Sequence, residues 1–297
     1  MYMRVLTLLL ALAVAPTVSF ADMAQHTEVC VAESEQDIAA LFDRWNESLK
    51  TGDPYKVVAN YASKSVLLAT VSSKPRFTVE EKADYFQHFL ENQPVGRIDS
   101  RTIELDCNLA IDEGLYSFTF QKTGVTVKAR YSFTYKWDGV KWLITSHHSS
   151  KLPAEQAPTE EPVHAVARHS EVCVAASEKE IEALLDRWME SLQSGNAHKV
   201  MTHYAARSVL LPLSSTKPRL TLDDKEDYFR HFLKDRPLVH VHSRTIELDC
   251  NMAIDEGLYT FTFQRTGNIV NARYNIVYKW DGLQWLITSD HSSIYPQ

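Results

Sequence analysis

The stretch SRTIELDCN occurs twice in the chain, at residues 100–108 and again at residues 243–251. The offset of 143 residues between them extends far beyond this stretch in both directions. Aligned without a gap, residues 28–150 and 171–293 are roughly 63% identical. A period this long is that of a whole domain rather than of a solenoid unit, so the sequence predicts two tandem copies of one fold.

The segments outside the copies have their own composition. Residues 1–21 combine one basic residue, Arg4, with an apolar run of about 11 residues and a small-residue end, which is typical of a secretory signal peptide and too short to span a bilayer. We therefore expect a periplasmic or secreted protein without membrane contact after cleavage. The domains are predicted at residues 28–152 and 169–297, joined by a Pro-rich linker at 153–168.

Composition excludes several classes of protein. The 297 residues are 44% hydrophobic and 23% charged, which is ordinary globular usage and argues against a disordered chain. The net charge is -7, and no basic run interrupts the sequence. Because binding to phosphates needs clustered Lys and Arg, we expect no nucleic-acid partner.

Four cysteines are present, and none belongs to a C-x-x-C pair, which argues against a zinc or thioredoxin-type motif. In an oxidising compartment they predict two disulfides, for which sequence order alone allows three pairings. The repeat favours pairing within each copy, because each copy must fold largely by itself. The predicted bridges are Cys30–Cys107 and Cys173–Cys250.

Each copy begins with helical signals and ends with strand signals. Ser34-x-x-Asp37 and Thr78-x-x-Glu81 predict capped helices, and Asp53-Pro54 predicts a short helix between them. After Pro94 the apolar pattern changes to a period of two. The sequence therefore predicts an α+β fold, with helices packed on a curved antiparallel sheet. The strands are expected at residues 66–70, 100–108, 115–121, 125–137 and 142–149.

Strand parity suggests a pocket between sheet and helices. Arg101 shares parity with the apolar Ile103, and His148 shares parity with Ile144, so both are expected to point inward. Such a pocket suits a small, partly apolar, anionic ligand. The alternative stays open that the aromatic residues are core, that Arg101 pairs with a carboxylate and that His148 is a hydrogen-bonded core histidine. The candidate residues of the two copies are Trp45, Tyr61, Tyr85, Arg101, Tyr116 and His148, and Trp188, Tyr204, Tyr228, Arg244, Tyr259 and His291.

Other charged positions carry weaker signals. Arg130 and its counterpart Arg273 lie on the parity opposite the aromatic row of their strand and predict a structural or interface ion pair. His240 and His242 alternate on one strand of the second copy only, and two histidines alone are too few to predict a metal site. We predict no metal and no cofactor, and we assign no catalytic residue.

A further set of motifs resembles a known family. The motifs are Asp43-Arg44-Trp45-Asn46, the run Thr51 to Val58, Tyr85 to Leu90, Ala129 to Phe133, and Asp138-Gly139 through Trp142 to Ser150. They resemble the bacterial branch related to the calcium/calmodulin-dependent protein kinase II association domain, also labelled SgcJ/EcaC-type or SnoaL-like. All belong to the NTF2-like superfamily, so the resemblance implies a cone of three helices on a curved sheet.

What the resemblance implies for function is broader, because this fold hosts association hubs, cyclases, isomerases and binding proteins. The chain has no kinase glycine-rich loop, H-R-D or D-F-G motif, and no deep carboxylate base is identifiable from the sequence. We expect a non-catalytic protein that mediates association, binds a small ligand in the cone, or does both. The alternative is a cyclase or isomerase that uses His148 and His291 as acid and base, with Arg101 and Arg244 holding an anion.

The duplication also predicts a partner for each domain. Fusing two copies raises their effective concentration, which favours pairing of the two sheets face to face within one chain. The pairing face carries either Arg130, Ser132 and Thr134 or the alternate row Tyr131, Phe133 and Tyr135, and parity does not decide between them. Association into a larger homo-oligomer is left open.

Overall fold

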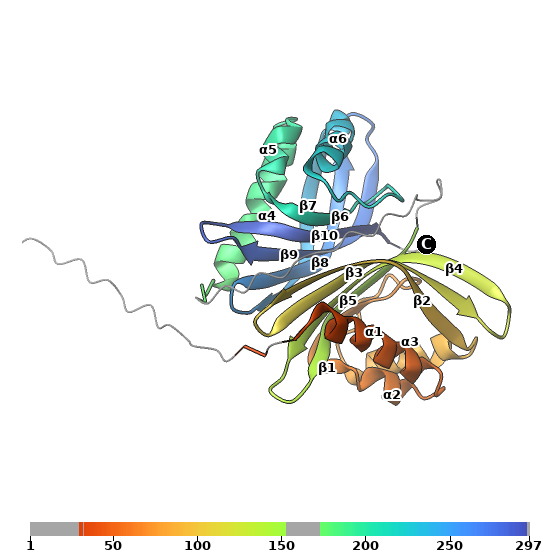
Figure 1. The fold of residues 1–297 in the computed structure, drawn as a ribbon. Helices are drawn as coiled ribbons and strands as arrows, with labels where there is room; N and C mark the ends of the chain where they lie inside the picture. Colours follow the sequence, from red (N-terminus) through yellow and green to blue (C-terminus); the bar gives the residue numbers. More distant parts are fainter. Residues whose placement is uncertain (1–29, 32, 153–172, 296–297) are drawn as a thin grey trace, which may run out of the picture.

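The structure is a computed structural model that describes residues 30–31, 33–152 and 173–295. The predicted signal peptide and linker lie outside these residues. Two domains, each a five-stranded sheet with helices on one face, pack with their sheets together and their helices outermost (Figure 1). Domain 1 contains α1 (Glu35–Leu49), α2 (Pro54–Val58), β1 (Tyr61–Leu68), α3 (Val79–Leu90), β2 (Pro94–Asp106), β3 (Leu109–Phe120), β4 (Val125–Trp137) and β5 (Trp142–Lys151).

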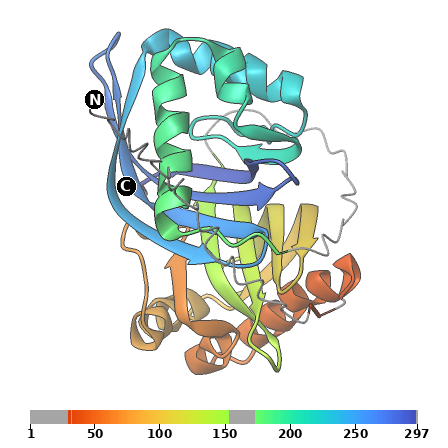
Figure 2. The same cartoon turned by 90° about the vertical axis from the view of Figure 1, so that its left-hand side faces the viewer.

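Domain 2 repeats this order with one extra 3₁₀ turn. In the view turned by 90°, the long helix α4 is seen to cross the outer side of its sheet (Figure 2). The two domains are therefore the tandem copies that the repeat predicts. The elements are α4 (Glu178–Gln193), α5 (Ala197–Met201), β6 (Tyr204–Leu211), α6 (Leu222–Phe232), η1 (Leu233–Asp235), β7 (Pro237–Leu248), β8 (Met252–Phe263), β9 (Ile269–Trp280) and β10 (Trp285–Ile294).

The helix starts follow from their caps. The Ser34 hydroxyl accepts from the Asp37 N–H while the Asp37 carboxylate accepts from the Ser34 N–H, and Thr78 forms the same reciprocal box with Glu81. Asp53 caps α2, which has Pro54 at its first position. These caps satisfy N–H groups that have no partner inside the helix, so the three predicted helix starts are confirmed.

Each sheet is mixed rather than wholly antiparallel. The strand order is β1-β5-β4-β3-β2 in domain 1 and β6-β10-β9-β8-β7 in domain 2, and the edge strands β1 and β6 run parallel to β5 and β10. A parallel pair needs a long connection, which the intervening helix and strands supply. Strands β1, β2 and β3 also begin earlier than predicted, at Tyr61, Pro94 and Leu109.

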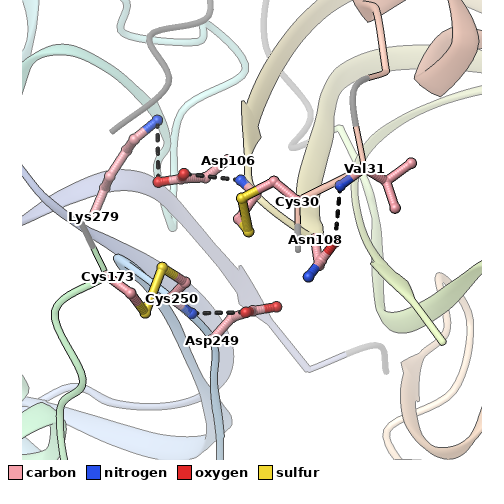
Figure 3. The surroundings of a disulfide bond; sticks show 9 residues. Cys30, Val31, Asp106, Asn108, Cys173, Asp249, Cys250 and Lys279 are labelled. Atoms are coloured by element: carbon pink, nitrogen blue, oxygen red, sulfur yellow. Dashed lines mark hydrogen bonds and ion pairs between the residues drawn. A yellow bond between two sulfur atoms is a disulfide. The ribbon is translucent and has the colours of Figure 1, made fainter. Parts of the chain in front are cut away.

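Both disulfides join residues of the same copy, as the repeat predicts. The Cα atoms are 4.5 Å apart in Cys30–Cys107 and 4.9 Å apart in Cys173–Cys250. Figure 3 shows both bridges at the boundary between the domains, where Lys279 of domain 2 reaches the carboxylate of Asp106. Each bridge ties the segment before the first helix of a copy to the sheet of that copy.

The core of each domain lies between its helices and its sheet. In domain 1 the rings of Phe42, Trp45, Phe86, Tyr131 and Phe133 are all at most 1% exposed and pack together there. Within the described residues, no helix is long and apolar enough to cross a membrane.

Candidate functional site

A small cavity opens in the cone of domain 1, between α1, α3 and the sheet. Its volume is about 10 Å³, roughly the space that one water molecule needs. Aromatic side chains fill the remainder of the cone, so the cavity is much smaller than a pocket for a drug-sized ligand. The lining residues are Trp45, Leu67, Ala69, Thr70, Tyr85, Phe86, Phe89, Tyr116, Phe118, His147 and Ser149.

One end of this cavity is polar. The Ser149 hydroxyl forms hydrogen bonds with the hydroxyls of both Thr70 and Tyr116. His147 Nδ1 lies 2.7 Å from the Tyr61 hydroxyl, and its Nε2 has no hydrogen-bond partner among the described residues. Burial lowers the pKa of His147 to about 3, so its ring is neutral at physiological pH. This end can therefore exchange hydrogen bonds with a small polar molecule.

The predicted pocket residues divide into two groups. Trp45, Tyr85 and Tyr116 line the cavity, and Tyr61 reaches it through His147. Arg101 is not among the lining residues: its guanidinium pairs with the buried Asp112 carboxylate at 2.9 Å, which is the alternative that the sequence left open. Burial raises the pKa of Asp112 to about 6, although Arg101 favours its charged form.

The prediction that His148 faces the cone is corrected by a bulge in β5. Ile144 pairs with Tyr135, but Ser146 pairs with Thr134, so Thr145 is an extra residue in the ladder. One extra residue reverses the side-chain alternation beyond it. His147 therefore points into the cone and His148 points away from the helices, toward domain 2.

The corresponding bulge in β10 lies at Thr288 and places Asp290 in the cone of domain 2. Its carboxylate accepts a 2.5 Å hydrogen bond from the Tyr204 hydroxyl, which in turn accepts one from Trp188 Nε1 at 3.2 Å. Burial raises the pKa of Asp290 to about 6. This deep carboxylate was missed from the sequence because regular alternation places position 290 on the outer face; the His147/Asp290 difference between the copies was its signal.

The remaining candidates of domain 2 follow the pattern of domain 1. Arg244 Nε lies 3.2 Å from Asp255 Oδ1, and the Tyr259 hydroxyl lies 2.6 Å from Ser292 Oγ. The Tyr228 ring stacks on Phe232 at 5.5 Å. His291 lies between the domains, like His148.

Two buried arginines link the domains reciprocally. Arg130 of domain 1 donates to the carbonyl oxygens of Pro212 and Ser292. Arg273 of domain 2 donates to those of Ala69, at 2.6 Å, and Ser149, at 3.1 Å. Both arginines are 1% exposed, and burial lowers the pKa of each to about 10, so they remain charged. The predicted interface position is observed, but the contacts are with carbonyl oxygens rather than in an ion pair.

Histidines occupy the middle of the interface. The rings of His148 and His291 stack with centroids 3.7 Å apart and planes 12° from parallel. Each ring forms a hydrogen bond with a serine hydroxyl of the opposite domain. Ser293 Oγ lies 2.7 Å from His148 Nε2, and Ser132 Oγ lies 2.9 Å from His291 Nδ1. Burial lowers the pKa of both histidines well below the usual range, and each imidazole is therefore neutral.

Buried carboxyl groups also accept hydrogen bonds across the interface. Ser289 donates to Glu113 at 2.6 Å, and Ser146 donates to Glu256 at 2.5 Å. Burial raises the pKa of Glu256 to about 8 and that of Glu113 well above its usual value. Apolar packing between the domains forms a separate cluster of Leu109, Ile111, Met252, Ile254 and Val277.

Arg130 and Ser132 thus belong to the pairing face, while the Tyr131, Phe133 and Tyr135 row belongs to the helix-side core. This settles the question that parity left open. The pairing face therefore combines these polar residues with the apolar cluster of Leu109, Ile111, Met252, Ile254 and Val277.

Comparison with known proteins places both copies in one family. The family model of the calcium/calmodulin-dependent protein kinase II association domain matches residues 34–153 and again residues 177–296. No curated protein matches the chain.

Solved structures match single domains. A calcium/calmodulin-dependent protein kinase II association domain structure from Xanthomonas campestris is 45% identical in sequence. The match covers 44% of this chain and 99% of that chain, with a TM-score of 0.39. An NTF2-like protein of unknown function from Pseudomonas putida is 17% identical, with coverage of 39% and 84% and a TM-score of 0.36. A cystatin-like protein of unknown function from Nostoc punctiforme is 14% identical, with coverage of 40% and 92% and a TM-score of 0.36.

Proposed function

We propose a function from one premise: the chain belongs to the calcium/calmodulin-dependent protein kinase II association domain family, in both of its copies. It is an exported, non-catalytic binding protein whose two association domains form a preassembled pair within one polypeptide. The reciprocal insertion of Arg130 and Arg273 is the observation that carries this proposal.

A buried guanidinium is costly unless its donors are satisfied. Arg130 and Arg273 each find acceptors on the opposite domain, so separating the domains would leave carbonyl oxygens without these donors and expose both charged groups. His148 and His291 likewise depend on hydroxyls from the opposite domain. The pairing face is therefore built for another sheet of its own kind.

Equilibrium unfolding of the full chain tests this proposal. Because the two sheets complete each other, we expect one cooperative transition for both domains, and we expect a fragment of residues 22–152 to self-associate. Two separate transitions in the full chain, together with a monomeric fragment, would refute the pairing.

The polar end of the domain 1 cavity favours a second role, binding of a small polar molecule. A ligand larger than water requires the partly buried Tyr85 and Phe89 to move, and it would then meet Thr70, Ser149 and the free His147 Nε2. His148 and His291 are 0% exposed at the domain interface, so an acid–base role for them in the cone has no support.

Native mass spectrometry of the purified full chain tests this second role. We expect a retained small molecule that is lost in Thr70→Leu, because leucine is the residue at the equivalent position 213 of domain 2 and would close the polar end. Equal retention by wild type and variant would exclude the cavity as the binding site.

A further inference from the structure

The edge strand β7 of domain 2 carries two exposed histidines at a bulge. His240 and His242 are two residues apart, and in a regular strand such side chains are separated by roughly 6.6 Å. The register shifts between Val241 and Ser243, so His242 is the bulged residue. Bulges redirect side chains, and here the two ring centroids lie only 4.8 Å apart.

That spacing suits chelation of one metal ion. An ion about 2.0–2.1 Å from an imidazole nitrogen lies about 3.2 Å from the ring centroid, so two ligating rings at square or tetrahedral angles have centroids about 4.5–5.2 Å apart. The observed 4.8 Å lies within this range. The planes of the two rings are 75° apart, which is an edge-to-face arrangement.

The hydrogen bonds around His242 fix the tautomer that a metal ligand on Nδ1 needs. Thr260 Oγ1 donates its single proton to Asn271 Oδ1 at 2.7 Å. It must therefore accept from His242 Nε2, which lies 2.6 Å away. His242 then carries its proton on Nε2 and presents the lone pair of Nδ1. Metal-ligating histidines commonly donate the other ring N–H in this way.

Domain 1 shows that the bulge itself brings these two positions together. The equivalent residues are Arg97 and Asp99, which form an ion pair of 2.6 Å beside a bulge of the same register. An opposite-charge pair connects the two positions in one copy, and two imidazole rings in contact occupy them in the other. The duplication thus supplies a natural comparison.

We propose that His240 and His242 bind a divalent transition-metal ion at the open edge of domain 2, with Thr260 and Asn271 as positioning residues. Imidazole ligands suit Cu²⁺, Ni²⁺ and Zn²⁺, and Cu²⁺ binds tightest in the general order of affinity. Within residues 30–31, 33–152 and 173–295, no third His, Cys, Asp or Glu completes a cluster here, so water fills the remaining coordination positions. The site is separate from the cones and from the domain interface.

Titration of untagged full chain with Ni²⁺ by calorimetry tests this site. We expect one Ni²⁺ site with higher affinity than all other sites on the chain. This high-affinity site should disappear in the double variant His240→Arg/His242→Asp, which installs the residues of domain 1. His231→Gln, at an exposed histidine of α6, is the matched control and should leave that site intact.

Two further readouts separate chelation from a structural effect. Thr260→Val should weaken Ni²⁺ binding by about tenfold, because the proton on His242 loses its acceptor. Addition of Zn²⁺ should shift the nitrogen NMR resonances of His240 and His242 together. A double variant that keeps the tightest site with unchanged affinity, or Zn²⁺ that shifts neither histidine, would overturn the proposal.

Discussion

Thr145 decides which of two adjacent histidines faces the cone. As the extra residue of the β5 ladder, it turns His147 inward and His148 toward domain 2. Residue-by-residue alternation predicts the opposite, because a bulge leaves no mark in a pattern of period two. The difference between His147 and Asp290 was visible in the repeat, but its place in the cone was not.

His147 should make stability depend on pH. Burial lowers its pKa from 6.5 to about 3, so between these values the unfolded chain binds a proton that the folded chain does not, and stability falls as pH falls. The loss is about 1.4 kcal/mol per pH unit at most, or about 2 kcal/mol between pH 6.5 and 5. In denaturant unfolding, the free energy of unfolding of His147→Gln should therefore differ less from that of wild type at pH 5 than at pH 7. For the control His88→Gln, at an exposed position, the difference from wild type should be the same at both pH values. An equal difference at both pH values would show that His147 does not titrate this way.

Glu256 should act in the opposite direction. Burial raises its pKa from 4.5 to about 8, so the folded chain holds a proton that the unfolded chain loses between these values. Stability therefore falls as pH rises, by about 1.4 kcal/mol per pH unit at most. Glu256→Gln keeps a neutral side chain and should gain stability relative to wild type from pH 5 to pH 8 in the same unfolding assay. A constant difference across this range would contradict the buried neutral carboxyl.

At the scale of elements, local chemistry explains what the sequence predicts well. The capping boxes at Ser34 and Thr78 and the Asp138-Gly139 turn between β4 and β5 involve neighbours in sequence, and all three boundaries were predicted. The parallel pairing of β1 with β5 joins distant segments and has no local signal. The early start of β2 was hidden because its first residues, Pro94 to Arg97, do not alternate in hydrophobicity.

Gly114 should be required for the bulge in β2. A Cβ atom at this position would lie 2.2 Å from the Ser100 carbonyl oxygen, which is backbone and cannot move aside. Gly114→Ala should therefore lower the free energy of unfolding of the full chain by about 3 kcal/mol, measured by denaturant unfolding. Gly124→Ala is the control: it has open space and a φ of +70°, and it should cost only about 1 kcal/mol of backbone strain. Equal losses would show that close packing at Gly114 is not the cause.

At the scale of the whole molecule, the repeat predicts the two domains, their disulfides and their pairing. It does not predict which row of β4 forms the pairing face, because both rows contain residues that can be buried. The structure assigns the aromatic row to the core and Arg130 and Ser132 to the interface. Polar side chains then find partners on the opposite sheet, so a sheet face that looks solvent-exposed in the sequence is buried.

Hydrogen exchange of the full chain, measured by mass spectrometry, tests the central account most directly. Arg130 belongs to domain 1, but it donates to Pro212 and Ser292 of domain 2. Arg130→Ala should therefore accelerate exchange in domain 2, around residues 204–216 and in β10. Arg101→Ala, which breaks an ion pair inside domain 1, should accelerate exchange more strongly around its partner Asp112 in β3 than around residues 204–216 and β10. If Arg130→Ala left exchange in domain 2 unchanged, the two sheets would not be paired as described.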